Sequence, residues 1–437
     1  MGLSVEVLRR PLEVFPEIIE QYGAIARARY APGMPISWVI GHPDAVEHIM
    51  KTNQKNYPRS AFFNRLVKEA IGLNLFTADG EIWHETRKKV APTLHRAKVM
   101  HWTQQIIDTV NETKAHWLAV AKSGETISLH EEMTLLALRI SLRTMFSTDI
   151  FTESTKIREG IRNLLWYANY RVSSPFSIDN LITTPRKRKY LNSKTTVYSA
   201  MTDLIEERKN GKIRKNDLLD LMLDAKDEET GIGMTDEQIK SEILGMLTGS
   251  NESTSAMLTW VVYELNRNPE KLAKMRDEIS TLGKSPETPE DFMRLQYPSM
   301  AIYEAMRLHP PVWLLDRSAT KEDVLMGYDV APDTNMLLPF FVLYRHPDFW
   351  EKPNEFIPER FTPEEVEKRH KYLYLPFGAG ARNCIGNHLV MIESIIILAI
   401  LMESFDIAPI SNEPVKPVVN FALVPGNKVL VKIKHRN

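Results

Sequence analysis

The sequence contains one cysteine, Cys384, among its 437 residues. A single thiol cannot form an intramolecular disulfide framework, an iron–sulfur cluster or a zinc site built from several thiolates. The shortage of cysteine also fits a chain that works in a reducing compartment. The sequence therefore predicts a cytoplasmic location and leaves the single thiol to be explained.

Long hydrophobic runs are absent as well. The longest uninterrupted apolar stretch, residues 395–402, falls well short of the roughly 20 residues that span a bilayer, and it indicates a buried helix. The N-terminal segment interrupts its apolar residues with charged ones, so it lacks the core of a signal peptide. We therefore expect no membrane anchor.

Neither sign of charge is in excess. The chain has 55 Lys plus Arg and 56 Asp plus Glu, which gives a net charge of -1. Nucleic-acid-binding proteins and membrane-surface helices usually carry a basic excess or stripe, so this balance argues against a nucleic-acid partner. No linker rich in Gly, Ser or Pro and no internal repeat divides the sequence, which predicts one domain over residues 1–437.

Helical periodicity covers most of the chain, whereas strand-like patterns are short and lie towards its two ends. The strand-like segments are ISWVIG at 36–41, about 324–338 and 429–433. This distribution is typical of a mainly α (α+β) protein and differs from the alternating βαβ pattern of a parallel sheet. The predicted helices cover about 12–22, 81–120, 130–147, 154–172, 186–209, 236–267, 269–282, 298–308 and 385–405.

The segment around the cysteine, PFGAGARNCIG at residues 376–386, carries the strongest chemical pattern. Its glycines permit a tight turn, and Cys384 stands where a helix is predicted to begin. The N-terminus of a helix stabilises a thiolate, which is a nucleophile, a redox sensor or a soft metal ligand. A cysteine that is only a small buried hydrophobe does not need glycines on both sides. A nucleotide-binding Gly-x-Gly-x-x-Gly loop is excluded, because its sixth position is Asn383 and no βαβ unit surrounds it.

Residues 377–386 match the Phe-x-x-Gly-x-Arg-x-Cys-x-Gly haem-ligand loop of the cytochromes P-450. The resemblance implies the cytochrome P-450 fold, with a long central oxygen-activating helix over haem b, and makes Cys384 the thiolate ligand of the iron. It also implies that Phe377 packs beside the sulfur and that Arg382 reaches a haem propionate. The cofactor-binding positions implied in this loop are Phe377, Gly378, Arg382, Cys384 and Gly386.

Two further segments resemble the family's structural support of that loop. Residues 304–307 give Glu-x-x-Arg, a pair that shares one helix face but is common on solvated helices. Residues 356–361, FIPERF, resemble the segment whose arginine joins that pair in the family. The resemblance implies a buried structural network of Glu304, Arg307 and Arg360.

Other basic residues are assigned to the haem propionates by the same resemblance. Trp83 and Arg87 stand one helical turn apart in Trp-x-x-x-Arg. Arg317 follows the Pro-Pro turn at 310–311, in the place where the family has an arginine that contacts the other propionate.

Residues 244–260 place small and polar residues between apolar helical flanks. Such a middle weakens a helix and indicates a local distortion, or else a loop that joins two helices. The segment resembles the family's Ala/Gly-Gly-x-Asp/Glu-Thr oxygen-activating sequence, with Ser250 in place of a glycine and Ser253 in place of the threonine. A hydroxyl and a neighbouring carboxylate can relay protons through water. The resemblance implies a haem contact at Gly249 and three catalytic candidates, Glu252, Ser253 and the adjacent Thr254.

The implied reaction is monooxygenation, in which one atom of dioxygen enters a C–H bond of a largely apolar small molecule by hydroxylation or oxidative demethylation. No flavin or cluster signature is present, so the electrons would come from a separate ferredoxin or flavodoxin with its reductase. Candidate contacts for that partner are Lys88, Lys89, Arg96 and Lys98. Candidate substrate-pocket residues, taken from the family's pocket segments, are Phe62, Phe63, Val312, Leu314 and Phe421.

Three points stay open at this stage. The basic run at 186–189 is either an exposed helix start or a contact for a polar or anionic substrate group. A peroxygenase driven by hydrogen peroxide would keep the haem and change the oxidant, although the Glu252-Ser253 pair favours dioxygen. A non-enzymatic haem or thiolate sensor would use Cys384 without turnover.

Overall fold

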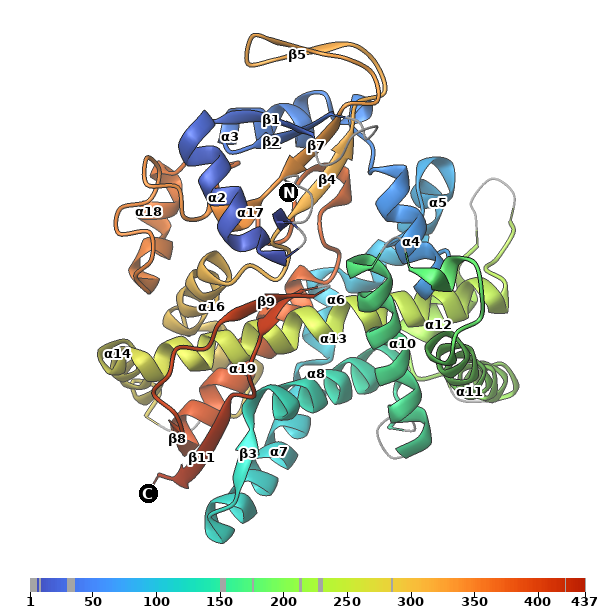
Figure 1. Cartoon of the computed structure of the whole chain (residues 1–437). Helices are drawn as coiled ribbons and strands as arrows, with labels where there is room; N and C mark the ends of the chain where they lie inside the picture. Colours follow the sequence, from blue (N-terminus) through green and yellow to red (C-terminus); the bar gives the residue numbers. More distant parts are fainter. Residues whose placement is uncertain are drawn as a thin grey trace.

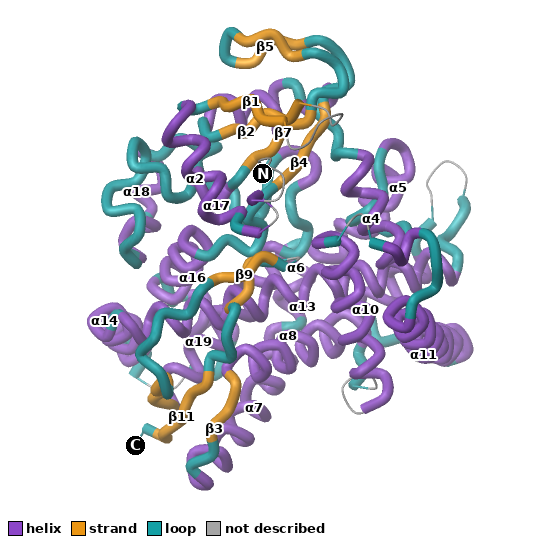
Figure 2. Tube along the Cα trace, in the orientation of Figure 1, coloured by secondary structure: helices purple, strands orange, loops and turns teal. Residues whose placement is uncertain are grey.

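Helices form the body of the protein and small sheets lie at its edges (Figures 1 and 2). The computed structural model describes residues 6–7, 9–29, 36–149, 155–174, 177–211, 214–226, 231–283, 286–420 and 422–436. The longer helices are α2 (Pro11–Tyr22), α4 (Ala61–Ile71), α5 (Gly80–Val90), α7 (Thr103–Ser123), α8 (Leu129–Phe146), α10 (Thr155–Ser173), α11 (Pro185–Asn210), α13 (Asp236–Arg267), α14 (Pro269–Ser280), α16 (Tyr297–Leu308) and α19 (Asn387–Ser404). The shorter ones are α3 (Pro43–Glu47), α6 (Arg96–His101), α12 (Leu218–Asp224), α15 (Pro289–Met293), α17 (Phe340–Leu343) and α18 (Pro363–Lys368). The predicted mainly α fold is confirmed.

The largest sheet among the described residues has the order β1-β2-β7-β4. Strands β2 and β7 pair in parallel, and the other two pairings are antiparallel. Its strands are β1 (Ile25–Arg29), β2 (Ile36–Ile40), β7 (Asn335–Leu338) and β4 (Leu315–Ser318). Smaller sheets contain β3 (Thr126–Ser128), β11 (Leu430–His435) and β8 (Phe405–Pro409), then β9 (Pro417–Val419) with β10 (Leu423–Pro425), and β5 (Asp323–Leu325) with β6 (Tyr328–Val330).

One predicted helix is wrong in its length. The pattern at 81–120 suggested a single helix, but the structure has α5, a 3₁₀ turn at Ala91–Leu94, then α6 and α7. Pro92 has no backbone N–H and therefore cannot continue the hydrogen-bond ladder of α5. This break turns the chain, so that α5 lies beside the cysteine loop while α7 packs on α19.

Helix α13 crosses the middle of the molecule and is unbroken over Asp236–Arg267, so the alternative of a loop near residue 250 is wrong (Figure 1). Its hydroxyl side chains bond back to carbonyls one turn earlier: Thr248 Oγ1 to Leu244 O at 2.7 Å and Thr259 Oγ1 to Ser255 O at 2.6 Å. Such bonds satisfy the hydroxyls without interrupting the ladder, and they tend to bend a helix only slightly.

Helix α19 follows the cysteine loop and lies in the main hydrophobic core with α7, α8, α13 and α16. Among the described residues it is the one helix that is long and apolar enough to cross a membrane, and most of it is buried within the protein. Burial against other helices is the arrangement expected of a core helix. Helices α13 and α19 thus bring the polar middle of one and the start of the other to the same central region.

Candidate active site

The cysteine loop is a tight turn that only glycines allow. Gly378 and Gly380 have φ values of +71° and +67°, which side chains with a Cβ rarely adopt. A Cβ on Gly380 would also lie 2.6 Å from the carbonyl oxygen of Met50. The backbone N–H of Cys384 donates to Phe377 O at 2.8 Å and closes the loop. The turn predicted from the glycines is therefore present.

The Cys384 sulfur faces an interior cavity, and protein surrounds it on its other sides. Burial raises the pKa of the thiol, whereas backbone N–H groups of Gly386 and Asn387 and the charge of Arg87 act in the opposite direction. The helix start thus favours a thiolate, as the sequence suggested, but burial has the larger effect on the free thiol. A bound metal cation would reverse this balance, because a coordinating thiol is deprotonated.

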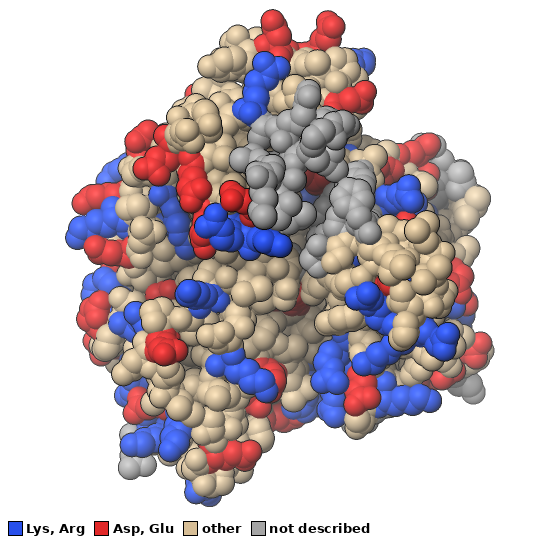
Figure 3. All heavy atoms as spheres, viewed as in Figure 1, with Lys and Arg blue, Asp and Glu red and all other residues tan. Residues whose placement is uncertain are grey.

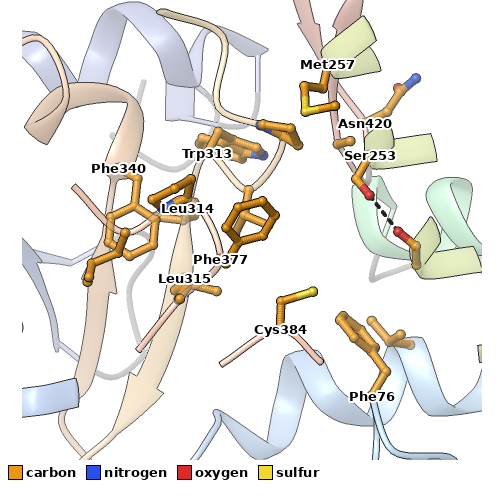
Figure 4. A pocket seen from close by; sticks show the side chains of 18 of the residues that line it. Phe76, Ser253, Met257, Trp313, Leu314, Leu315, Phe340, Phe377, Cys384 and Asn420 are labelled. Atoms are coloured by element: carbon orange, nitrogen blue, oxygen red, sulfur yellow. Dashed lines mark hydrogen bonds between the residues drawn. The ribbon is translucent and has the colours of Figure 1, made fainter. Parts of the chain in front are cut away.

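A cavity of about 1680 Å³ separates the cysteine loop from α13. Figure 4 shows the Cys384 sulfur pointing into it, with Phe377 close by and Ser253 on the opposite side. The wall is largely apolar, and one side of it is formed by Trp313, Leu314 and Leu315. The cavity therefore offers a flat apolar molecule a thiol on one face and a helix on the other.

Six arginines line this cavity, and four of them form one group: Arg59, Arg87, Arg317 and Arg382. Burial, followed by repulsion from Arg317, lowers the pKa of Arg59 to about 10. Burial and repulsion from Arg59 lower the pKa of Arg382 to about 10 in the same way. Arginines that lower each other's pKa have a positive charge that the neighbouring carboxylates do not fully balance. The group therefore favours an anionic ligand.

Their other contacts hold these arginines in place around the loop. Arg87 donates to the carbonyl oxygen of Asn383 at 2.9 Å, and Arg382 donates to Ala78 O at 2.9 Å and pairs with Asp79. The Trp83 ring lies beneath both guanidinium groups, 4.3 Å from Arg382 and 5.5 Å from Arg87. The structure thus brings Trp83, Arg87 and Arg382 together at the loop, as the sequence suggested.

These features fit haem. The porphyrin is a flat apolar ring that carries two carboxylates and a metal, and the cavity combines apolar walls, a cluster of arginines and one thiol. A Cβ built on Gly249 would meet nothing within 4 Å, so α13 presents backbone and open space to the cavity at that residue. Each chemical part of haem therefore has a counterpart among the residues that line the cavity.

Ser250, Ser253 and Thr254 of α13 all line the cavity, and the last two differ in their hydrogen bonds. Ser253 Oγ donates to Gly249 O at 2.5 Å, the bond drawn as a dashed line in Figure 4. Thr254 Oγ1 is buried and has no partner among the described residues. Ser253 therefore has a fixed orientation with its lone pairs available, whereas Thr254 can both donate and accept.

Glu252 does not line the cavity and lies between α13 and α10. Its two carboxylate oxygens accept from Asn169 Nδ2 at 3.1 and 3.2 Å. Burial raises the pKa of Glu252 to about 6, although the hydrogen bonds from Asn169 and the Ala422 backbone oppose that rise. The carboxyl group can therefore hold or release a proton near neutral pH.

Glu304, Arg307 and Arg360 come together where α16 packs on the 3₁₀ turn at Pro358–Phe361. Arg307 forms a bidentate ion pair with Glu304, with two N···O distances of 2.8 Å and both side chains fully buried. Arg360 Nε lies 3.4 Å from the same carboxylate. Arg307 also donates to the carbonyl oxygens of Tyr344, Pro353 and Glu355, so it ties three separate positions of the chain to α16.

Of the predicted pocket residues, Val312 and Leu314 line the cavity, while the side chains of Phe62 and Phe63 and residue Phe421 lie outside the described part of the chain. Sequence reasoning missed several polar residues that line the cavity. Glu393 carried a signal, since it is an acidic residue within the largely apolar helix α19. Arg59, Asn169 and Glu242 carried none.

Comparisons with known proteins agree with this geometry. The family model described as "Cytochrome P450" matches residues 2–433. A "Cyclooctat-9-en-7-ol 5-monooxygenase" of Streptomyces melanosporofaciens is 27% identical over 94% of this chain and 88% of its own length. A "Pentalenene oxygenase" of Streptomyces avermitilis is 24% identical over 96% of this chain and 91% of its own length. The crystal structure of a "cytochrome P450DA heme domain" has a TM-score of 0.87 and 21% identity, over 99% of this chain and 94% of its own.

Proposed function

Because this chain belongs to the cytochrome P450 family and is therefore a haem-dependent monooxygenase, we propose that it inserts one atom of dioxygen into a C–H bond of a largely apolar small molecule. The observation that carries the proposal is the position of one thiol and two hydroxyls on opposite sides of one largely apolar cavity. When bound there, haem supplies the iron that activates oxygen.

In this proposal Cys384 is the thiolate ligand, and the arginines at the loop hold the haem carboxylates. Arg87, Arg317 and Arg382 are the carboxylate-binding residues inferred from the sequence, and Arg59 adds a fourth cation at the same place. The two haem carboxylates would balance the arginine charges and so relieve the mutual repulsion that lowers the arginine pKa values. Trp83 keeps two of these guanidinium groups in place through cation–π contacts.

The residues of α13 have the task of bringing protons to the side of the cavity opposite the thiol. Glu252 holds a proton on its carboxyl group, and Asn169 keeps that group oriented. We assign the ordering of the final hydrogen bond to Ser253 Oγ, which Gly249 O fixes in orientation. Thr254 Oγ1 is the second candidate, because it is buried in the cavity wall without a partner among the described residues.

The substrate class follows from the remaining wall of the cavity. Apolar groups of Trp313, Leu314 and Val418 line it, and they favour a hydrocarbon-rich molecule. The names of the two Streptomyces relatives specify cyclooctat-9-en-7-ol and pentalenene, both of which are unsaturated hydrocarbon skeletons. We propose a cyclic, largely hydrocarbon substrate for this chain.

Electrons would come from a separate protein, a ferredoxin or flavodoxin with its reductase. Arg96 and Lys98 are exposed on α6, and α6 packs against α19, the helix that starts at the cysteine loop. Basic residues there would suit an acidic electron donor close to Cys384. The cytoplasmic location stays a prediction.

The decisive experiment is the absorption spectrum of the reduced, carbon-monoxide-treated protein beside that of Cys384→Ala. A strongly red-shifted Soret band in the wild type only is the expected result, and an unchanged band in the variant would remove Cys384 as the ligand. Turnover under ¹⁸O₂ with an electron-transfer system and a cyclic hydrocarbon should then give a product heavier by one labelled oxygen atom. Product formed equally fast with hydrogen peroxide alone would instead indicate a peroxygenase.

A further inference from the structure

The hairpin of β9 and β10 forms one wall of the cavity. Its strands have only three residues each, and residues 416–420 and Ala422 line the cavity. The strands pair antiparallel, and the backbone N–H of Gly426 extends the pairing by donating to Lys416 O at 2.8 Å. Figure 3 shows mostly uncharged atoms on the surface over β9, so the hairpin stands between the cavity and solvent. A two-stranded hairpin is marginally stable alone, and its position depends on what it packs against.

Strand β10 packs on α13, and the polar tips of two aromatic rings of that helix bind the hairpin backbone. Trp260 Nε1 donates to Leu423 O at 3.0 Å, and both residues are completely buried. The hydroxyl of Tyr263 accepts from the backbone N–H of Val415 at 3.1 Å. Because Leu423 O is buried, no water can replace the indole N–H as its donor without an opening of the structure.

The contact between α13 and the hairpin has a small hydrophobic cluster of its own. The cluster contains Ala256, Trp260, Ala422 and Val424. The backbone N–H of Ala422 also donates to the carboxylate of Glu252, the acid to which we assign the proton. Since residues 252, 256, 260 and 263 repeat at helical spacing, the hairpin is bound to one face of α13 over about three turns.

Trp260 is held firmly, although it does not line the cavity. Its indole ring stacks on the imidazole of His309, with 3.9 Å between the centroids and 4° between the planes. His309 Nε2 lies 2.7 Å from a carboxylate oxygen of Glu264, which fixes the imidazole in turn. Trp260 therefore contacts a bound molecule only through the hairpin, and it gives the hairpin a rigid support.

We propose that Trp260 is a positioning residue that determines how a substrate lies in the cavity, because its hydrogen bond to Leu423 O sets how far the β9–β10 hairpin reaches inwards. This role rests on the proposed monooxygenase function. The wall is largely apolar, so the orientation of a hydrocarbon depends on the shape of the wall. A displacement of about 1 Å can change a rate about 100-fold, so a small shift of the hairpin is enough to change which carbon is oxidised.

Two variants of matched chemistry test the role. Trp260→Phe keeps an aromatic ring in the small cluster and removes the N–H that donates to Leu423 O. Trp350→Phe is the control: Trp350 is 3% exposed, its Nε1 donates to the backbone oxygen of Leu343 at 3.1 Å, and neither residue lines the cavity. Each variant leaves one buried carbonyl without its donor, so we expect similar losses of stability. The carbon-monoxide spectrum of each variant checks that it is folded and carries haem.

Hydrogen exchange of residues 415–426 in the haem-loaded full chain measures the attachment of the hairpin directly. We expect the hairpin amides to exchange roughly 3- to 10-fold faster in Trp260→Phe than in the wild type, because one hydrogen bond that holds them is lost. Tyr263→Phe should act in the same direction, since the N–H of Val415 loses its acceptor. Trp350→Phe should leave exchange in this segment unchanged.

Two further measurements test the effect on the cavity. Titrations with imidazole and with 4-phenylimidazole, followed at the Soret band, compare the same ligand without and with an apolar ring. Trp260→Phe should change the dissociation constant of 4-phenylimidazole several-fold and leave that of imidazole unchanged. Limonene is a cyclic hydrocarbon with several non-equivalent C–H positions, and the ratio of its oxidised products should change by about threefold or more in Trp260→Phe. Trp350→Phe should change neither quantity.

Three results would overturn the proposal. The first is equal exchange of residues 415–426 in the wild type and in Trp260→Phe. The second is faster exchange with unchanged 4-phenylimidazole binding and an unchanged product ratio, which would leave Trp260 as a stabilising residue only. The third is an equal effect of Trp350→Phe on binding and products, which would assign the changes to lost stability. A wild type that oxidises no limonene would count against the proposed function instead, and the exchange and imidazole measurements would then decide the role of Trp260.

Discussion

Two regions of the molecule surround their buried carboxyl groups differently: the network at α16, and the cavity with its close surroundings. On α16, Glu304 is paired with Arg307, and the five N–H donors of that guanidinium make five hydrogen bonds. Glu304 also accepts from the backbone N–H of Ile357 at 2.8 Å. The Glu304–Arg307 pair thus has its main hydrogen-bonding capacity filled within the protein.

Three buried glutamates in or near the cavity wall have no cation among the groups that shift their pKa. Burial raises the pKa of Glu252 to about 6 and that of Glu242 to about 7. Glu393 is completely enclosed, burial raises its pKa well above the usual value, and its Oε2 has no partner among the described residues. These groups carry a proton more readily than an exposed glutamate does.

The difference separates two functions of buried acids. A buried ion pair whose hydrogen bonds are all made holds the surrounding chain in place. It affects stability mainly because removing one partner leaves the other charge buried and unpaired, which costs free energy. Unpaired acids destabilise the fold when ionised, but they keep protons inside the protein at neutral pH. Glu304 belongs to the first kind, and Glu242, Glu252 and Glu393 belong to the second.

Glu304→Gln is the variant for which we expect the largest loss of stability. The variant leaves the Arg307 charge buried without its counter-ion, so we expect a loss of about 3–5 kcal/mol in the free energy of unfolding. Denaturant unfolding and the haem content of the purified protein measure it. Glu365→Gln breaks the exposed Glu365–Lys368 pair and serves as the control, for which we expect no measurable change. An equally stable Glu304→Gln would show that the network does not support the fold.

Glu393→Gln should instead raise the free energy of unfolding at pH 7. Because the pKa of Glu393 is raised in the folded protein, the native state binds more protons than the unfolded state above about pH 4.5, and wild-type stability falls as pH rises. Glutamine has no proton to lose, so the variant should be the more stable one at pH 7. The difference should grow as pH rises above about 4.5, as measured by urea unfolding at a series of pH values. A variant less stable than wild type at pH 7 would mean that Glu393 is ionised and paired.

The Glu304–Arg307 ion pair was easier to predict from the sequence than the raised pKa values of the other buried glutamates. The cysteine loop and the Glu304–Arg307 pair each occupy a short stretch of sequence, so the family resemblance could identify them. Spacing alone indicated only that Glu304 and Arg307 share one helix face. The protonation of Glu252 and Glu393 depends on which groups the fold places around them. Asn169, which orients Glu252, is 83 residues away in sequence and belongs to no motif.

Some features of the helices could be predicted from the sequence and others could not. The periodic patterns of α13 and α19 were readable because each buries a long face, whereas the end of α5 depends on Pro92, a local signal that the apolar pattern obscured. The continuity of α13 through its polar middle was not readable, because the sequence does not tell whether such hydroxyls interrupt the helix or bond back to its own carbonyls, as they do here. The edge strands β1 (IARAR) and β4 (LDRS) lack the run of β-branched and aromatic residues that made β2 (ISWVI) readable.

The two hydroxyls of α13 provide the next test, on the cavity side. Ser253→Ala removes a hydroxyl that Gly249 O orients, and we expect about tenfold less product per electron pair with more hydrogen peroxide released. Thr254→Val keeps the shape of the side chain and removes the unpartnered hydroxyl. Parallel assays of product, peroxide and reductant consumption decide between them. Normal coupling in Ser253→Ala with loss in Thr254→Val would transfer the role to Thr254.

Glu252→Gln gives the smallest expected change in stability and the sharpest test of the proton assignment. Since the pKa of Glu252 is about 6 in the folded protein, ionisation above pH 6 costs the wild type roughly 1–2 kcal/mol, and the variant should regain that amount at pH 8 but not at pH 4. Coupled turnover should fall although stability rises, because the amide orients water but cannot deliver a proton. The wild-type inflection near pH 6 in coupling should vanish in the variant. A variant that is more stable and fully coupled would separate the raised pKa from catalysis and leave Glu252 as a buried acid without a proton-relay role.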